Sequence, residues 1–479
     1  MDMREAVLKL FSGKISLALI EFLSIALFSQ YLGTGPLGSF FVFQAIIGII
    51  GIPSNFGVTR AAEKQLSANE PQGKVISSSI LMVGLLLIPW VFGFIILEPF
   101  IEQYVGINGV LPLVVLGLIV AQARELSIHF LSGQLSVEKT PLLKVIGKVV
   151  WLSTGLILIY YGWGNGLIIL SFIIGDITII LGAILRLDLV FGKPDIHRMR
   201  SLISFGRYVF IGSLGGFVYS WMDVAILRIF VSPSLIGAYE IAWRVASLSM
   251  MLTQAIRTSL FPQISHWHTE GCFEKIESAY NQWLQLPFYL TIPAFTGSVV
   301  LGKDILETLF SIDLEIAYFI LLIFMLEKIL RSIYMILGPA LYAMDKPELG
   351  YRGSIAAVAT NLILNIILIP LFGLIGAAIA TSISALVAAV INLSYVNNII
   401  SIKPRWKNIG WCIVSASIMA VGVKLIRPVL PQGLLLVLSG VFTGIVFYLI
   451  VLLSSERIRI EIISILGDRS RIFRTFERL

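Results

Sequence analysis

The chain has 479 residues, of which 57% are hydrophobic and only 13% are charged. Soluble domains carry about 25% charged residues, so this chain has too few polar residues to cover the surface of several water-soluble domains. The composition therefore predicts an integral membrane protein. A membrane-spanning helix needs about 20 apolar residues, and a chain of this length has room for roughly 12 to 14 of them with short connections.

Taken in chain order, apolar segments between polar breaks predict an all-α, polytopic fold with about 14 transmembrane helices. The first run contains Lys14 and Glu21 and has no small-residue cleavage site, so we interpret it as a retained span and not as a signal peptide. The expected spans are 10–31, 37–58, 75–97, 110–131, 142–161, 166–187, 205–230, 235–260, 283–301, 316–342, 354–372, 375–396, 409–426 and 434–453.

The loops separate the basic residues between two sides. With the N-terminus inside, roughly 22 Lys and Arg residues fall on inner segments, and only Lys303, Lys424 and Arg427 fall on outer ones. This asymmetry predicts a multi-pass protein of the cell (inner) membrane with both termini in the cytoplasm. The formal net charge of +7 is then explained by topology and anionic lipid, which makes a nucleic-acid partner unnecessary.

An internal repeat is visible in the chain. Segment 32–38 resembles 231–237, Arg124 has a counterpart in Arg331, and 157–166 parallels 367–376, at offsets of about 200 to 210 residues. An even number of spans per repeat predicts two parallel six-helix halves related by an axis along the membrane normal. The expected divisions are 1–200 and 201–400 for the halves, 401–453 for two extra helices and 454–479 for a basic cytoplasmic tail.

Four motifs resemble a known family. They are Tyr31–Phe40, Asn55–Ala62, Gly237–Arg244 and, most specifically, Asn361–Thr381. Together they are similar to the polysaccharide transporters, a group with O-antigen repeat-unit flippases, of the multidrug, oligosaccharidyl-lipid and polysaccharide exporter superfamily. The resemblance covers essentially the whole chain. It implies a flippase that moves a lipid-linked oligosaccharide, on a polyprenyl phosphate or pyrophosphate carrier, from the inner to the outer leaflet by alternating access through a cationic central cavity.

One difference from the related lipid II flippases narrows the range of expected substrates. Lipid II flippases of the same superfamily carry an arginine cluster in their first helix, and only Lys14 and Glu21 stand there in this chain. This argues against a peptidoglycan precursor. The resemblance also implies partners, namely the lipid-linked glycan, membrane lipids and glycan-assembly enzymes of the same pathway.

Ionisable side chains inside the spans are the candidate site. Each costs at least about 2.5–3.5 kcal/mol on insertion scales, so it is expected to face a cavity or a partner. Because Arg and Lys suit phosphate oxygens, the basic groups are expected to bind the anionic head group. The candidate cations are Arg124, Arg331, Arg244, Arg228, Lys14 and Arg207, and the candidates for coupling to H⁺ or Na⁺ are Glu21, Asp223 and Glu240.

Structural alternatives stay open for several of these residues. Glu240 and Arg244 have the i, i+4 spacing of a neutral intrahelical pair. Lys14 and Arg207 lie near span ends, where long basic side chains also reach the interface. Arg124 and Arg331 occupy equivalent positions of the two halves, which favours a shared role at the site.

Other motifs indicate little chemistry. His266 and His268 lack a third ligand, so neither a metal site nor a cofactor is expected. A phosphate-binding Gly-x-x-x-x-Gly-Lys-Ser/Thr loop is absent from the sequence, so transport is expected to draw on an ion gradient, the membrane potential or substrate supply.

Two other functions remain as alternatives. A cation-coupled multidrug exporter has the same expected fold, but its site should be acidic and aromatic. A membrane glycan polymerase or ligase fits less well, because the longest outer segments, 98–109 and 302–315, are short and contain no His. The preferred interpretation is a transporter and not an enzyme.

Overall fold

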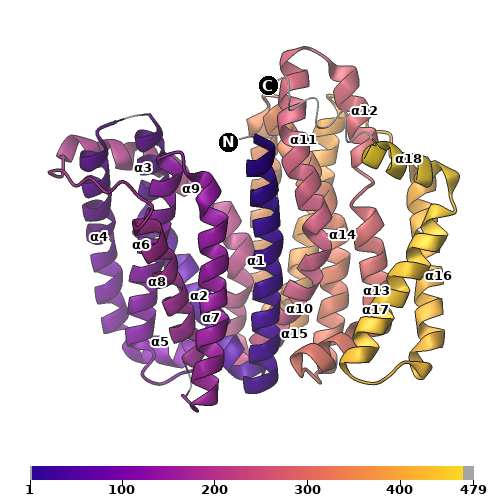
Figure 1. Ribbon diagram of the computed structural model, residues 1–479, viewed down its shortest axis with the longest axis horizontal. Helices are drawn as coiled ribbons and strands as arrows, with labels where there is room; N and C mark the ends of the chain where they lie inside the picture. The colour runs from indigo at the N-terminus through magenta and orange to yellow at the C-terminus, as the bar shows by residue number, and fades with distance from the viewer. Residues whose placement is uncertain (1–2, 69, 165, 468–479) are drawn as a thin grey trace. The chain divides into compact units, whose positions relative to one another are not determined.

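The computed structural model describes residues 3–68, 70–164 and 166–467, and within these residues the fold is built from helices (Figure 1). The chain forms two compact units, Met1–Gly237 and Ala238–Leu479. The predicted all-α fold is confirmed. Ten described helices are long and apolar enough to cross a membrane, and the segment Ser16–Leu32 of the helix that begins at Met3 is also apolar.

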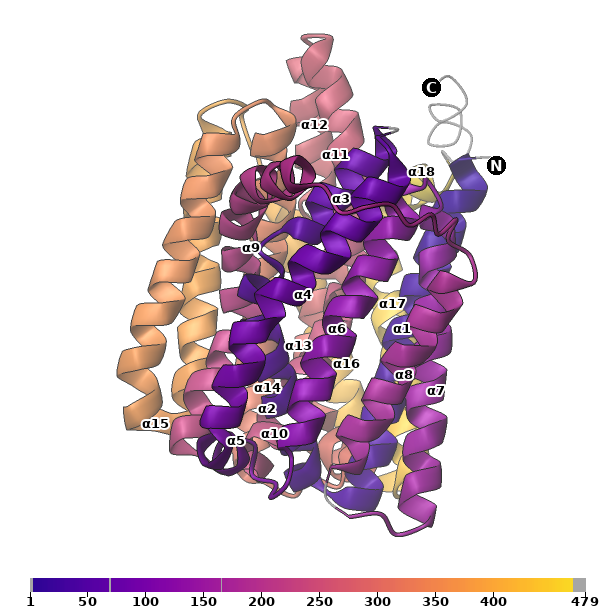
Figure 2. The same cartoon turned by 90° about the vertical axis from the view of Figure 1, so that its left-hand side faces the viewer.

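In the first unit, α6 lies among α2, α3 and α8, and the pairs α1 with α7 and α2 with α9 are also in contact. Figure 2 shows α4, α6, α7 and α8 running next to one another. Asp195 begins α9 as its N-cap, with its carboxylate accepting a hydrogen bond from the backbone N–H of His197 at 2.9 Å. The elements are α1 (Met3–Leu32), α2 (Thr34–Asn55), α3 (Val58–Ser67), α4 (Gln72–Ile96), α5 (Glu98–Val105), α6 (Leu111–Gly133), η1 (Val137–Lys139), α7 (Thr140–Tyr160), α8 (Leu167–Ile184) and α9 (Ile196–Phe230).

The second unit begins within α10. Its helix α14 packs against α11, α13 and α15, and α16 packs against α13 and α17. The elements are α10 (Pro233–Ser247), η2 (Leu248–Met250), α11 (Met251–Thr269), α12 (Phe273–Trp283), α13 (Phe288–Phe310), α14 (Glu315–Ala343), α15 (Pro347–Asn397), α16 (Trp406–Ile426), η3 (Arg427–Val429), α17 (Leu434–Leu453) and α18 (Glu456–Gly467).

The expected spans fall on these helices, while the count of 14 stays a prediction, since ten described helices meet the criterion of length and apolar composition. Two of them, 354–372 and 375–396, are the two arms of α15, which breaks at Gly373 with φ 54° and ψ −127°. Because that backbone conformation suits only glycine, one apparent helix of 51 residues serves as two spans. The short helices α3, α5 and α12 were not expected, because they are too short or too polar for a hydropathy criterion. Helix α18 lies in the tail 454–479, where the alternation of Ile and Arg favours an amphipathic helix.

The compact units differ from the halves expected from the repeat. Contacts divide the chain after Gly237, because α9 packs against α2, α3 and α4 of the first unit. The divisions 1–200, 201–400, 401–453 and 454–479 concern sequence symmetry, and they stay predictions.

The first turns of α2 and α10, which carry the two segments of the sequence repeat, meet inside the first unit. Thr34 and Ser234 approach to 2.6 Å between their hydroxyl oxygens. A Cβ on Gly38 would lie 1.6 Å from the backbone oxygen of Pro233, and one on Gly237 would lie 2.2 Å from that of Thr34. Both glycines are therefore required for the close approach of the two motifs.

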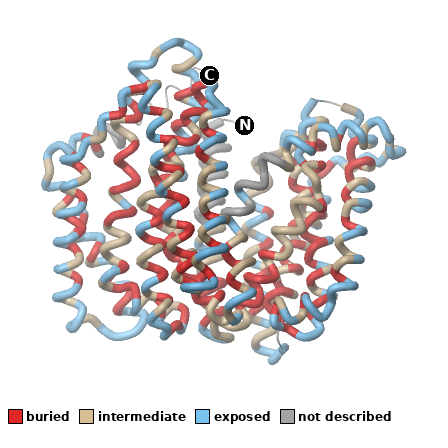
Figure 3. Tube along the Cα trace, turned by 180° about the vertical axis from the view of Figure 1, so that it is seen from behind, coloured by how far each residue is buried: buried red, intermediate tan, exposed pale blue. Residues whose placement is uncertain are grey.

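Burial follows the expectation for helices in lipid. Exposed turns on the outer faces alternate with buried turns facing neighbouring helices (Figure 3). On α4, for example, Leu85, Ile88 and Phe92 are exposed, whereas Ser78 and Ser79 are buried. Apolar residues on the outside and small or polar residues at helix contacts are typical of membrane bundles.

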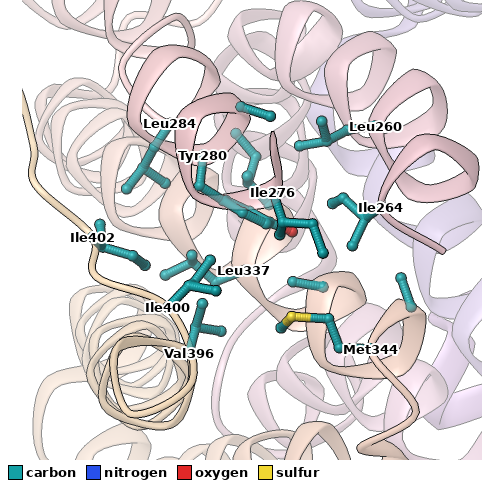
Figure 4. Packing of buried hydrophobic residues seen from close by; sticks show 14 of the residues in the cluster. Leu260, Ile264, Ile276, Tyr280, Leu284, Leu337, Met344, Val396, Ile400 and Ile402 are labelled. Atoms are coloured by element: carbon teal, nitrogen blue, oxygen red, sulfur yellow. The ribbon is translucent and has the colours of Figure 1, made fainter. Parts of the chain in front are cut away.

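An apolar core in the second unit joins α11, α12, α14 and the end of α15. Tyr280 and Ile276 of α12 point toward Leu337 and Val396 (Figure 4). This core anchors the helical hairpin of α11 and α12. The expected span 235–260 covers only the first half of α11, and α12 falls in an expected loop.

Candidate functional site

A cavity of about 460 Å³ lies inside the first unit, between α2, α3, α6, α7, α8 and α9. Its volume lies within the roughly 300–1,000 Å³ typical of ligand sites. Charged and amide side chains line the cavity, although the outer faces of the surrounding helices are apolar. The polar residues in the wall are Gln44, Asn55, Arg60, Gln122, Arg124, Glu125, His129, Lys148 and Asp176.

Arg124 is the charged centre of this wall. One of its guanidinium nitrogens donates to both carboxylate oxygens of Asp176 on α8, at 2.9 Å each. The other donates to Glu125 at 2.9 Å. Two carboxylates thus surround one cation, and Asp176 is buried. Arg124 lines a cavity as the sequence suggested, but its charge is already compensated within the protein.

The network continues from Glu125 toward α3. The Nε2 atom of His129 lies 3.7 Å from Glu125, and its Nδ1 atom lies 2.5 Å from Glu63. A chain of titratable groups therefore leads from the partly exposed Glu63 to the buried Asp176. The sequence offered no signal for it, because its members come from α3, α6 and α8.

Lys148 occupies another part of the wall. Its ammonium lies 3.7 Å from the carboxylate of Glu21 on α1 and 4.5 Å from the ring centroid of Trp151. Glu21, expected as a coupling group, is thus an ion-pair partner of a cavity cation. Lys14 is outside the described side chains.

Amide side chains form a second polar group in the wall. Asn55 donates to the Oε1 atom of Gln122 at 3.1 Å, and Gln122 donates to the backbone oxygen of Gly51 at 3.2 Å. Within the described part of the chain, the Oε1 atom of Gln44 is buried and accepts no hydrogen bond. Sequence reasoning centred on charges missed these amides.

Trp221 forms an aromatic part of the wall. It packs so closely on α2 that a Cβ on Gly48 would lie 2.7 Å from its indole nitrogen. Phe43 and Phe172 are the other aromatic residues of the wall.

The second unit has its own buried charge cluster. Glu327 and Lys328 of α14 are fully buried and lie 2.7 Å apart, and Arg331 lies 3.7 Å from Glu327. On α10, Arg244 lies 3.7 Å from Glu240. The expected intrahelical pair of Glu240 and Arg244 is therefore present, and Arg331 also faces a carboxylate.

The remaining candidates lie on α9. Arg228 donates to the backbone oxygens of Tyr104, Gln103 and Val231 at 2.6, 2.7 and 3.1 Å, so it fastens α9 to the end of α5. Arg207 is exposed and donates to the hydroxyl of Tyr208 at 2.9 Å. Asp223 is buried.

Comparisons with known proteins identify families and relatives that this chain resembles. The profile of the family described as polysaccharide biosynthesis protein matches residues 35–314, and that of lipid II flippase MurJ matches residues 197–451. "Probable low-salt glycan biosynthesis flippase Agl15" of Haloferax volcanii is 35% identical, over 96% of this chain and 97% of the relative. "Probable flippase AglR" of the same organism is 31% identical, over 90% of this chain and 92% of its own length.

Solved structures agree with the fold. A lipid II flippase MurJ in an inward closed conformation superposes with a TM-score of 0.76 at 18% identity, covering 94% of this chain and 99% of the other. An inward-facing multidrug resistance MATE transporter gives 0.65 at 16% identity, covering 80% and 94%. The predicted family resemblance is confirmed, and the chain belongs to the polysaccharide biosynthesis protein family.

Proposed function

We propose that this protein is a flippase that moves a lipid-linked oligosaccharide, carried on a polyprenyl phosphate or pyrophosphate, from the inner to the outer leaflet. The observation that carries the proposal is the polar cavity inside the first unit, in a family whose full-length relatives are named glycan biosynthesis flippases. The relatives' names do not favour the multidrug-exporter alternative.

The cavity suits this task physically. A glycan head group carries many hydrogen-bonding groups, and each of them is costly to leave unpaired in hydrocarbon. A wall of amides, carboxylates and cations replaces water for such a head group. Meanwhile the carrier tail stays in lipid beside the exposed apolar faces of the helices.

The proposed orientation in the membrane rests on the distribution of Lys and Arg among the loops. We infer that both termini and the basic segments face the cytoplasm in the cell membrane, supported by the excess of Lys and Arg on those segments. The cavity wall includes residues of α3, a helix with basic residues of the inner side, and this supports the proposal that the cavity receives its substrate from the cytoplasmic side.

Movement between leaflets is proposed to occur by alternating access, without a chemical step on the substrate. Coupling to an H⁺ or Na⁺ gradient through Glu21, Asp223 or Glu240 is the mechanism we favour. Enzymes that assemble the glycan on the same carrier are the proposed partners.

The anionic head group is proposed to bind at basic residues. The candidates are Arg124, Arg331, Arg244, Arg228, Lys14 and Arg207, and Arg60 joins them because it lies exposed at the cavity. Arg124→Ala and Arg331→Ala should each reduce glycan export while the protein still inserts. Normal export in the double variant would assign both arginines to structure.

A deletion strain tests the function in cells. Loss of the gene should leave the lipid-linked glycan accumulating on the inner leaflet, and expression of the wild-type chain should restore its outer-leaflet level. A normal outer-leaflet level in the deletion strain, with any related transporter genes also removed, would contradict the flippase proposal.

A further inference from the structure

The charges that line the cavity of the first unit are largely compensated from within. Arg124 lies between Asp176 and Glu125, and Lys148 lies beside Glu21. A phosphate entering the depth of the cavity would have to displace carboxylates from these cations. Breaking such pairs in a partly buried site is costly, because the stranded carboxylate keeps its charge.

The amide side chains in the cavity wall suit a ligand other than a phosphate. The buried Oε1 atom of Gln44, which has no partner among the described residues, is an acceptor and needs a donor. The carboxylates of Glu125 and Asp176 are also acceptors. A phosphate dianion has only acceptor oxygens and satisfies none of these groups, whereas a sugar hydroxyl donates and accepts at the same atom.

Trp221 adds an apolar surface to this wall. A pyranose ring combines a rim of hydroxyls with a face of C–H groups, and a large aromatic ring with a polar edge matches both. Gly48 is needed for the ring's position, since any side chain there would collide with the indole. Amides and an aromatic face thus converge in a cavity of about 460 Å³, which is large enough for a small ligand.

Arg60 differs from the other cavity cations. It is exposed, and within residues 3–68, 70–164 and 166–467 it forms no ion pair. A basic group without a carboxylate neighbour is the suitable partner for a phosphate.

We propose that the cavity of the first unit is a saccharide subsite, in which Gln44 and Trp221 recognise the sugar of the lipid-linked glycan while Arg60 holds the phosphate. This inference rests on the proposed function and adds the part of the substrate that the site recognises. It also makes the amides and Trp221 the determinants of specificity for the glycan.

The test compares two ligands on the full chain in lipid nanodiscs. One is the lipid-linked glycan extracted from the source cells, and the other is polyprenyl phosphate that carries no glycan. Gln44→Leu and Trp221→Leu should each raise the Kd for the glycan-bearing lipid by about tenfold, as expected for the loss of about 1.4 kcal/mol, and leave the Kd for polyprenyl phosphate unchanged. Arg60→Gln should weaken both ligands.

Matched control variants remove an amide or an indole outside the cavity. Gln65→Leu deletes an amide whose buried Oε1 atom also has no partner among the described residues, and Trp163→Leu deletes an exposed indole; neither residue lines the cavity. Both should bind both ligands like the wild type. Trp221→Phe keeps an aromatic face and should retain most of the glycan binding, which protects the test if Trp221→Leu fails to fold.

The outcomes separate the two proposals. Equal weakening of both ligands by Gln44→Leu and Trp221→Leu, or no effect on either ligand, would overturn the saccharide subsite while leaving the flippase proposal intact. A wild-type chain that binds neither ligand would instead count against the proposed function itself.

Discussion

Arg124 on α6 donates from one guanidinium nitrogen to both carboxylate oxygens of Asp176 on α8, at 2.9 Å each. The two residues are 52 positions apart and come from separate spans. Each ion alone would be costly inside a membrane, and the pair removes much of that cost. The contact therefore ties two helices together at the wall of the cavity.

The pair predicts a characteristic stability pattern. Arg124→Ala or Asp176→Ala alone strands a buried charge and should lower the free energy of unfolding by about 3–5 kcal/mol. The double variant should lose less than the sum of the two single losses. Unfolding of the purified chain in detergent, measured for all four proteins, gives the coupling energy. Strictly additive losses would show that the contact contributes nothing.

The close contact between the first turns of α2 and α10 predicts strict limits on residue size. Gly38→Ala places a Cβ 1.6 Å from a backbone oxygen, so the two helix ends must separate, and the loss of stability should exceed the 1–3 kcal/mol typical of overpacking. Gly84→Ala on α4 is the control, since nothing lies within 4 Å of its Cβ position and alanine favours helix by about 1 kcal/mol. Thermal unfolding of both variants is the measurement. A Gly38→Ala protein as stable as Gly84→Ala would contradict the close contact.

The C-terminal helix α18 is predicted to be held by one carboxylate. Glu461 is buried and accepts hydrogen bonds from Gln285 at 2.5 Å and Asn408 at 3.0 Å. Glu461→Ala leaves these amides without their acceptor and should cost about 1–3 kcal/mol locally. Limited proteolysis should then cleave near α18 faster than in the wild type or in the exposed control Glu456→Ala. Identical cleavage rates in the three proteins would rule out this anchoring role.

The half-buried ion pair of Arg198 and Glu70 predicts a small acid dependence of stability. The hydrogen bond from Arg198 holds the pKa of the Glu70 carboxyl below its usual value of 4.5. Because the pKa is lower in the folded chain, the stabilisation is present above pH 4.5 and is lost as the pH falls through the folded value. Glu70→Gln should therefore flatten the acid limb of a plot of melting temperature against pH. An unchanged acid limb would show that the pair is uncoupled from folding.

Much of the fold could be predicted from hydropathy and charge, because spans and loops are local properties of the sequence. The break at Gly373 illustrates this, since the two arms of α15 were expected as separate spans. Short helices such as α3 and α12 escaped the prediction, because tertiary packing and not hydropathy stabilises them.

The site was less predictable. Sequence reasoning selected Arg124 as an unusual charge in a span, but its partner Asp176 comes from another helix, and no local pattern joins the two. Gln44 and Trp221 carry no charge, so the high insertion cost of ionisable groups did not single them out, and only their convergence on one cavity distinguishes them. Contacts between distant segments are set by tertiary packing, which a single sequence does not display.

The proposed function requires that this chain alone moves a lipid-linked glycan across the bilayer. The direct measurement uses vesicles containing the purified protein and the glycan-bearing lipid labelled with a fluorophore that membrane-impermeant dithionite reduces. We predict that the wild-type chain exposes the inner-leaflet label to dithionite, whereas protein-free vesicles keep it protected. A protected fraction equal to that of protein-free vesicles, with an applied proton or sodium gradient as well as without one, would contradict the account.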